Sequence, residues 1–213
     1  MACLVKKKSG KGGLVGIWAL EGGEEEHFSP ASLPSQDRER FMSIGVPQKR
    51  AQWAAVRLLL AEMCDGDPVR IVYDQHHKPS LSNSALKISI SHSYDKVAVI
   101  LQEDHETGID IELIKPKAER IAHKFMSDEE LRNLGRSHRL EQLYVHWCVK
   151  ESLYKLYGKK ELIFKDHLFV HPFAYAGEGW VKGSIGHGGK TETYDLFYEK
   201  VEEHMLSYVV HQK

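Results

Sequence analysis

Hydrophobic positions along the chain follow two different periods, and the change from one to the other marks the predicted elements. Residues 14–20 (LVGIWAL) form an apolar run typical of a buried strand. After Pro47, apolar side chains recur every three or four residues as far as Met63, which predicts a long helix. Shorter apolar runs predict strands at residues 71–74, 87–91, 97–101 and 108–113. Their close spacing favours a β-meander.

The second half of the chain repeats this order of helix and strands. Ser127 and Glu130 have the spacing of a capping box, and a second long helix is predicted from Arg139 to Tyr157, with Gly158 at its end. Alternating segments at 191–199 and 204–210 predict strands, with a turn over 183–189. The acidic, glycine-rich stretch 22–35 is predicted to be a loop.

These elements predict an α+β protein made of two similar halves in a pseudo-twofold arrangement. We expect each half to be a small antiparallel sheet with a long helix. The predicted division is between residues 1–104 and 105–213.

Composition and charge exclude several classes of function. The chain has 29 Lys and Arg against 30 Asp and Glu, a net charge of -1, so it lacks the basic field that holds a nucleic-acid backbone. Its three cysteines have no paired spacing and argue against a disulfide framework. No apolar run reaches membrane-spanning length, and the start of the chain lacks the order of a signal peptide. We therefore expect a cytoplasmic protein that binds neither nucleic acid nor membrane.

Two acidic residues share one face of the strand predicted at 108–113. In the segment GIDIE, Asp110 and Glu112 alternate with Ile109 and Ile111, so both carboxylates project from the same side. Their α-carbons would be about 7 Å apart, and the side chains could converge on one hard cation. The segment taken alone equally fits an amphipathic strand with a solvated polar face.

The second long helix contributes another acid and a cation. Trp147, Glu151 and Lys155 are spaced by four residues and lie along one stripe of the helix. By itself, this stripe is also explained by a core tryptophan beside an exposed Glu–Lys pair.

Other polar residues could meet phosphate oxygens. Ser91 and His92 end a predicted strand and offer hydrogen-bond donors. Cations are supplied by Lys49, Arg50 and Arg57 on the first helix and by Lys78 before Pro79. A solvated basic face would explain these cations too.

Taken together, three separated blocks resemble the 4'-phosphopantetheinyl transferase superfamily. The blocks are Ser91-His92-Ser93, GIDIE at 108–112 and WCVKESLYK at 147–155. The resemblance runs from about Arg38 to Gly158 and is greatest to the longer single-chain branch that includes the surfactin-synthetase-activating enzyme.

The resemblance implies a role for each matching residue. Asp110, Glu112 and Glu151 would hold Mg²⁺, with Mn²⁺ as an alternative, and Glu151 would also take the proton of the acceptor serine. Lys155 would contact the phosphate being transferred, and Trp147 would shape the site. The family's Gly-Lys-Pro motif has His77 in place of glycine here. The implied coenzyme A contacts are Arg50, Arg57, Lys78, Ser91, His92, Lys150 and Lys155.

The implied activity is transfer of 4'-phosphopantetheine from coenzyme A to a serine of an apo acyl carrier or peptidyl carrier protein, with release of 3',5'-ADP. Residues 1–104 would contact the nucleotide, and residues 105–213 would hold the metal and the catalytic groups. We expect a monomer. Segment 115–124 is either a carrier-docking segment or a solvated helix. Two alternatives remain open: a non-catalytic module of the same fold that binds coenzyme A or a carrier, and a metal-dependent phosphohydrolase.

Overall fold

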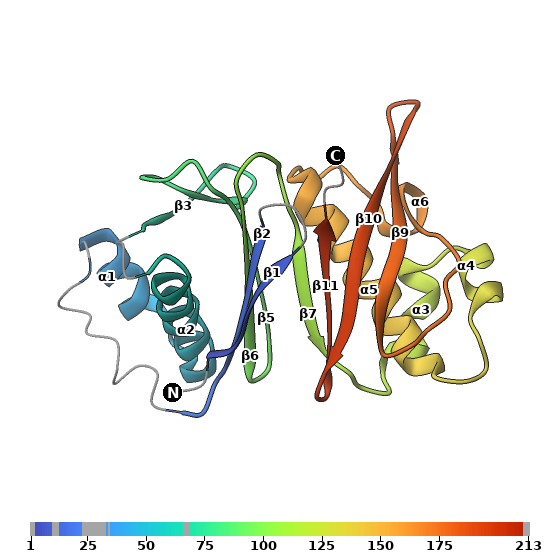
Figure 1. The fold of residues 1–213 in the computed structure, drawn as a ribbon, viewed down its shortest axis with the longest axis horizontal. Coiled ribbons are helices and arrows are strands. Elements are labelled where there is room, and N and C mark those ends of the chain that lie inside the picture. Colours follow the sequence, from blue (N-terminus) through green and yellow to red (C-terminus); the bar gives the residue numbers. More distant parts are fainter. Residues whose placement is uncertain (1–2, 10–12, 23–32, 34, 66–68, 211–213) are drawn as a thin grey trace.

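Two antiparallel sheets lie back to back at the centre of the molecule, and helices cover their outer faces (Figure 1). The computed structural model describes the chain except residues 1–2, 10–12, 23–32, 34, 66–68 and 211–213. The stretch predicted as a loop at 22–35 therefore falls mostly outside the described residues.

The first sheet is four-stranded, in the order β1-β2-β6-β5. Its strands are β1 (Cys3–Ser9), β2 (Gly13–Ala19), β5 (Lys87–Ser93) and β6 (Lys96–Gln102). Helix α2 (Pro47–Met63) packs an apolar face that includes Leu59 and Leu60 against this sheet. Helix α1 (Ser35–Ser43) precedes α2, and a separate hairpin of β3 (Ile71–Tyr73) and β4 (Pro79–Leu81) leads to β5.

The second sheet is five-stranded, in the order β7-β11-β10-β9-β8. Its strands are β7 (Ile109–Leu113), β8 (Leu168–Val170), β9 (Glu178–His187), β10 (Lys190–Val201) and β11 (His204–Val210). Helix α5 (Arg139–Tyr157) packs on it through buried residues such as Val149 and Leu153. Three shorter helices complete this side: α3 (Ala118–Phe125), α4 (Asp128–Asn133) and α6 (Phe164–His167).

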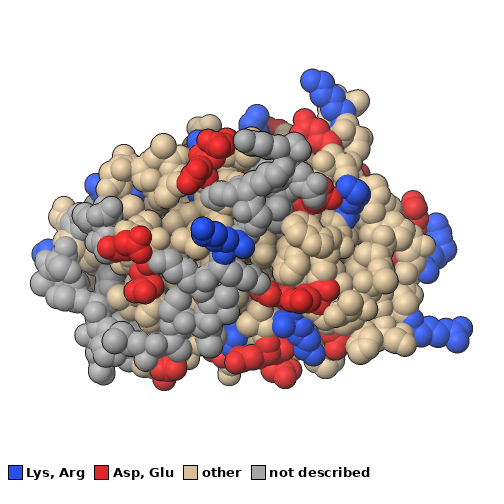
Figure 2. Space-filling model, in the orientation of Figure 1, with Lys and Arg blue, Asp and Glu red and all other residues tan. Residues whose placement is uncertain are grey.

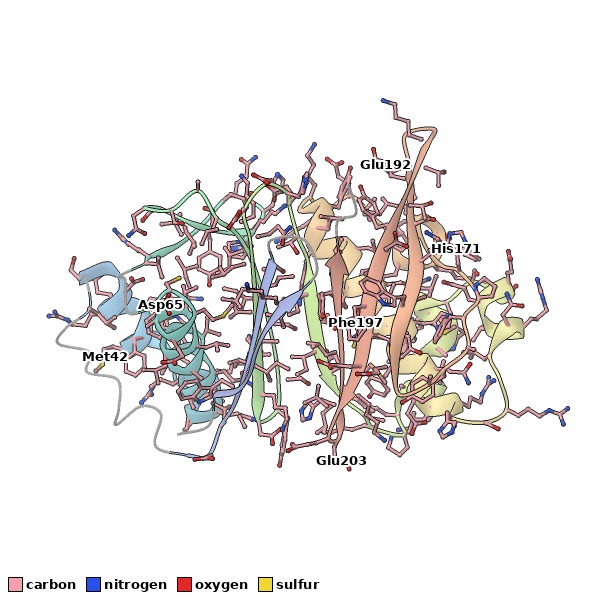
Figure 3. The ribbon with its side chains drawn as sticks, in the orientation of Figure 1. Met42, Asp65, His171, Glu192, Phe197 and Glu203 are labelled. Atoms are coloured by element: carbon pink, nitrogen blue, oxygen red, sulfur yellow. The ribbon has the colours of Figure 1, made fainter. Side chains whose placement is uncertain are left out.

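A continuous apolar layer joins the two sheets. Val15 and Ile100 of the first sheet meet Ile109 and Ile111 of β7, and all four side chains are fully buried. Phe197 of β10, labelled in Figure 3, lies at the edge of this layer. Burying a side chain of this size contributes about 1.5–3 kcal/mol, so the layer fixes β7 relative to both sheets.

The structure confirms the mixed α+β class and the two long helices. Helix α5 has the predicted bounds, with Gly158 at its C-cap in the left-handed conformation. The capping box of α4 is also present, because Ser127 and Glu130 bond each other's backbone N–H groups. All strands of the first sheet precede residue 104, and all strands of the second follow residue 105. The pseudo-twofold relation stays a prediction.

Two parts of the predicted topology are wrong. Strand β7 does not continue a meander with β6 but pairs with β11 in the other sheet. The predicted turn at 183–189 is mostly the end of β9, and the chain reverses only at Gly188 and Gly189. Strand patterns show that a segment is extended, whereas its pairing partner depends on contacts far along the chain. Strands β1, β4, β8 and β9 were not predicted.

The surface agrees with the balanced composition. Figure 2 shows acidic and basic side chains mixed over the described part of one face, without a large patch of one sign. Among the described helices, none combines the length and the apolar character needed to cross a membrane.

Candidate functional site

Asp110 and Lys155 form the centre of the candidate site, where β7 meets α5. The Lys155 ammonium donates to Asp110 Oδ1 at 2.8 Å and to the Ile109 carbonyl at 2.8 Å. Ser91 Oγ donates to the same Oδ1 at 2.7 Å. Asp110 is only 3% exposed, and its Oδ2 is buried without a hydrogen-bond partner among the described residues. A buried carboxylate oxygen without a donor is costly, which marks Oδ2 as an acceptor available to a ligand.

A glycine lets the helix approach the strand this closely. A side chain at Gly108 would collide with the backbone carbonyl of Ser152 on α5. The glycine of the GIDIE segment therefore allows the packing that brings Lys155 and Glu151 to Asp110.

Glu112 lies next along the same face of β7. Ser93 Oγ donates to Glu112 Oε2 at 2.7 Å and accepts from the Leu113 backbone N–H at 3.1 Å. Burial raises the pKa of Glu112 above its ordinary value, and the negative charge of Asp110 raises it further. Hydrogen bonds from the Ser93 and Trp147 side chains lower the pKa of Glu112 and so offset part of this rise.

Glu151 of α5 is the third carboxylate. Burial, followed by the charge of Asp110, raises the pKa of Glu151 to about 7, while Lys155 lowers it and Glu112 raises it. Glu151 therefore feels the negative charges of both Asp110 and Glu112. The structure brings together Asp110, Glu112, Glu151 and Lys155 from a strand and a distant helix.

The carboxylates are close but do not form a ready-made metal site. Within the described part of the chain, no group of three or more His, Cys, Asp and Glu side chains is arranged to hold a metal ion. Lys155, Ser91 and Ser93 instead occupy oxygens of Asp110 and Glu112. The donor set nevertheless fits Mg²⁺, a hard cation that prefers carboxylate oxygens, because it offers three acids and the free Oδ2 of Asp110.

Two pockets flank this centre. One is lined by the turn from His76 to Pro79, by β5, and by Lys155 with the Lys159–Lys160 pair beyond the end of α5. The other is lined by the first turns of α2, by the β5–β6 turn, and by Glu112, Lys115 and Lys117. Both pockets carry lysines, so anionic groups could lie on either side of the carboxylates.

His92 lines the second pocket, and the charges of Lys49 and Lys155 act on its ring. Its surroundings lower the pKa of His92, first by removing water and then through the positive charges of Lys155 and Lys49. Asp110 acts in the opposite direction. The His92 ring is therefore held mainly neutral at pH 7, able both to donate and to accept a hydrogen bond.

Comparison with known proteins decides the family. The chain is 31% identical over 149 residues to the protein named 4'-phosphopantetheinyl transferase AcpT of Escherichia coli O157:H7, covering 68% of this chain and 70% of the relative. The chain belongs to the 4'-phosphopantetheinyl transferase superfamily. The AcpT proteins of E. coli strain K12 and Salmonella typhimurium strain LT2 are 31% and 32% identical, over 70% and 59% of their lengths.

A family model described as the 4'-phosphopantetheinyl transferase superfamily matches residues 106–198. This segment of the phosphopantetheinyl transferase contains Asp110, Glu112, Glu151 and Lys155. The predicted superfamily and enzyme class are thus confirmed. The predicted surfactin-type branch stays a prediction, because the relatives compared carry the name AcpT.

The structure places two predicted coenzyme A contacts of the transferase elsewhere. The Arg57 guanidinium carbon lies 3.1 Å from the centre of the Trp53 ring, and its Nη2 lies 3.7 Å from Asp37 Oδ1. Burial lowers the pKa of Arg57 to about 10, despite the opposing charges of Tyr73 and Asp37. Arg50 donates two hydrogen bonds to the Ile44 carbonyl. Both arginines brace the α1–α2 region and line neither pocket beside the carboxylates, so the structure does not bring them to the site, and their role as coenzyme A contacts stays a prediction.

Lys150, another predicted coenzyme A contact, lies inside the protein rather than at the site. Its ammonium is fully buried and donates to the Phe125 carbonyl at 2.7 Å, to Glu130 Oε2 at 2.8 Å and to the Phe164 carbonyl at 3.2 Å. These three acceptors use all its donors. Lys150 therefore joins α5 to α3, α4 and α6 rather than meeting coenzyme A.

The remaining predicted contacts lie at the site, with two qualifications. Lys78 lines the first pocket, but its ammonium also contacts Glu106 at 2.6 Å and the Leu156 carbonyl at 3.0 Å. Ser91 is buried and directs its hydroxyl to Asp110. Sequence reasoning missed the Ser93–Glu112 bond and the pocket lysines 159 and 160. The basic pair directly after the helix-ending Gly158 was the signal for the lysines.

Proposed function

We propose that this phosphopantetheinyl transferase moves 4'-phosphopantetheine from coenzyme A to a serine of an acyl or peptidyl carrier protein and releases 3',5'-ADP. The observation that carries the proposal is the cluster of Asp110, Glu112, Glu151 and Lys155 between two lysine-containing pockets. Family membership supplies the reaction class.

In this proposal Asp110, Glu112 and Glu151 hold Mg²⁺, or Mn²⁺ as a substitute. When bound, the cation would neutralise charge on the pyrophosphate of coenzyme A. Before binding, Lys155 and Ser91 hold Oδ1 of Asp110, and Ser93 holds Oε2 of Glu112. Lys155 would then turn toward the phosphate being transferred, since it is 26% exposed and can leave Oδ1.

Glu151 is the proposed base for the acceptor serine. A serine hydroxyl is a poor nucleophile unless a nearby group takes its proton. The Glu151 side chain lies within the electrostatic reach of Asp110, Glu112 and Lys155, so it borders the position where transfer would occur.

The two pockets suggest where the substrates lie. The nucleotide of coenzyme A is assigned to the pocket lined by Lys78, Lys155 and the Lys159–Lys160 pair. Ser91 lies beside it through its bond to Asp110, and His92 lines the second pocket. The carrier is assigned to the other side, where Lys115 and Lys117 of the predicted docking segment 115–124 reach the second pocket. A carrier with acidic residues around its serine would complement these lysines. We also propose a monomeric, cytoplasmic enzyme.

The test is an intact-mass assay. Purified protein, coenzyme A and Mg²⁺ are incubated with a panel of apo carrier proteins from fatty-acid, polyketide and peptide synthesis. At least one carrier should gain the mass of one phosphopantetheine group, and a serine-to-alanine carrier should gain none. Absence of the gain across the panel would contradict the proposal and favour the non-catalytic binding module. Release of 3',5'-ADP without a carrier would instead indicate the phosphohydrolase.

A further inference from the structure

The β5–β6 turn is the point where both halves of the molecule meet the candidate site. It contains Ser93, whose hydroxyl binds Glu112 and the backbone of Leu113 in the other sheet. On the side of the first half, the Tyr94 carbonyl accepts from the side chains of Gln48 and Gln52 on α2, at 2.8 and 2.9 Å. The turn is therefore anchored to α2 and to β7 at once.

A second anchor comes from His204, the first residue of β11. Its Nε2 lies 3.2 Å from the Ser93 carbonyl and 3.2 Å from Asp95 Oδ1, while its Nδ1 is buried and has no hydrogen-bond partner in the described part of the chain. His204 is 2% exposed. The arrangement favours the neutral ring with its proton on Nε2, because a proton on Nδ1 would be buried without an acceptor.

Lys96 adds an ion pair across the same junction. Its ammonium lies 2.7 Å from Glu202 in the β10–β11 turn and 3.5 Å from Asp95 in the β5–β6 turn. Lys96 is 2% exposed. In Figure 3 the labelled Glu203 marks the β10–β11 turn at the lower edge of the molecule, where the β5–β6 hairpin also reverses. Two turns from different sheets are thus joined by the buried side chains of Lys96 and His204, whose acidic partners Asp95 and Glu202 are much more exposed.

These contacts form a continuous path to the carboxylate of Glu112. His204 fixes the carbonyl of Ser93, the hydroxyl of the same residue bonds Glu112 Oε2, and Lys96 holds the next hairpin against the turn. Groups that orient a metal ligand commonly change metal affinity by about 10–100-fold when removed.

We propose that His204 and Lys96 are positioning residues of the transferase site. By holding the β5–β6 turn against the β10–β11 turn, they fix Ser93 and, through its hydroxyl, orient the Glu112 carboxylate. This inference rests on the proposed role of Glu112 in holding the cation. It assigns function to residues of β11 and β6 that lie outside the cluster of acids.

The test measures Mn²⁺ binding by isothermal titration calorimetry, with coenzyme A present and no carrier. His204→Leu should weaken Mn²⁺ binding about tenfold, whereas His204→Gln, which keeps a terminal N–H donor, should bind nearly as the unchanged protein does. Ser93→Ala should give a similar loss. In the Ser93→Ala background, His204→Leu should add almost nothing, since both changes act on the same path.

Two further variants make the result unambiguous. Lys182→Met removes an exposed pair with Asp195 on the same sheet and should leave Mn²⁺ binding unchanged. Glu202→Gln removes the charge of an exposed side chain without changing its size, so it should not disturb the packing. It should weaken Mn²⁺ binding about threefold, because Lys96 loses its ion pair. Melting temperatures are measured for every variant, so that loss of folded protein is separated from loss of affinity.

The outcomes separate the two proposals. If the unchanged protein binds Mn²⁺ and all folded variants bind it equally, the positioning role is overturned while the proposed function stands. The same role is overturned if His204→Gln loses as much affinity as His204→Leu, or if the losses of Ser93→Ala and His204→Leu simply add. If the unchanged protein binds no Mn²⁺ with coenzyme A, both the metal assignment and this inference fail.

Discussion

Lys155 of α5 and Asp110 of β7 form an ion pair of 2.8 Å that joins the long helix to the strand beside it. The carboxylate is almost fully buried, whereas the ammonium is partly exposed. The negative charge of Asp110 is therefore stabilised by the Lys155 ammonium and the Ser91 hydroxyl. The nearby carboxylates of Glu112 and Glu151 carry the same charge and destabilise it. The same lysine thus stabilises the free enzyme and is proposed to serve the transferred phosphate.

Replacing this lysine should cost both stability and activity. Lys155→Met leaves Asp110 buried without its cation and should lower the free energy of unfolding by about 1–3 kcal/mol. Adding Asp110→Asn should recover most of that loss, because no uncompensated charge then remains. Urea unfolding of the two single variants and the double variant measures the coupling, and neither Lys155 variant should transfer phosphopantetheine. Simple addition of the two stability losses would contradict the dependence of Asp110 on Lys155.

Glu151 should make the metal-free protein less stable as the pH rises. Its folded pKa of about 7 lies above the ordinary 4.5, so between these values the folded state binds more protons than the unfolded state. The stabilisation is complete below pH 4.5 and is lost as the pH rises through 7. Glu151→Gln cannot ionise, and at pH 8 it should therefore exceed the unchanged protein in stability by about 1–3 kcal/mol.

The measurement for Glu151 is urea unfolding in EDTA at pH 5 and pH 8, together with the intact-mass transfer assay. The stability advantage of Glu151→Gln should shrink at pH 5, and transfer should be absent at both values. Glu141→Gln, on the same helix but paired with Lys200 near the surface, serves as the control and should not change the pH dependence. An unchanged stability profile in Glu151→Gln would show that the acids do not repel one another as described.

The site acids could be found from the sequence because each lies in a locally periodic element. Alternation in a strand places Asp110 and Glu112 on one face, and a four-residue spacing in a helix places Glu151 and Lys155 on one stripe. These patterns need no knowledge of the rest of the fold. The convergence of strand and helix came from the family resemblance, and the structure supplies its physical basis in the close packing at Gly108.

The buried cations could not be assigned in the same way. Arg57 and Lys150 have the sequence context of surface cations, yet their partners lie on other elements, at Asp37 and Glu130. The pairing of β7 with β11 is equally remote in sequence. Local periodicity gives the direction in which a side chain projects, but what it meets depends on tertiary packing.

Lys150 should prove structural when it is replaced. Lys150→Met leaves the fully buried Glu130 without its cation and should lower the free energy of unfolding by about 3–5 kcal/mol. Lys165→Met is the control in the same region, because it removes an exposed ion pair with Asp128. It should change the free energy of unfolding by less than about 1 kcal/mol. The KM for coenzyme A, measured on the folded fraction, should stay within about twofold. A large rise in KM without loss of stability would restore Lys150 as a substrate contact.

Glu106 should compete with coenzyme A for Lys78. The Glu106 carboxylate contacts the ammonium of Lys78 at 2.6 Å and that of Lys87 at 3.3 Å, and Lys78 lines the pocket assigned to the nucleotide. A phosphate that binds the Lys78 ammonium must compete with this carboxylate, and exposed pairs of this kind contribute up to about 1 kcal/mol. Glu106→Gln should therefore lower the KM for coenzyme A about two- to threefold at low salt, and less at high salt because screening weakens both interactions.

Lys78→Met should raise the KM for coenzyme A about tenfold with little change in kcat, since it removes binding that does not depend on the transferred group. Steady-state kinetics at two salt concentrations measures both effects, and a rise in KM for Glu106→Gln would mean that Glu106 orients Lys78 for the substrate instead of competing with it.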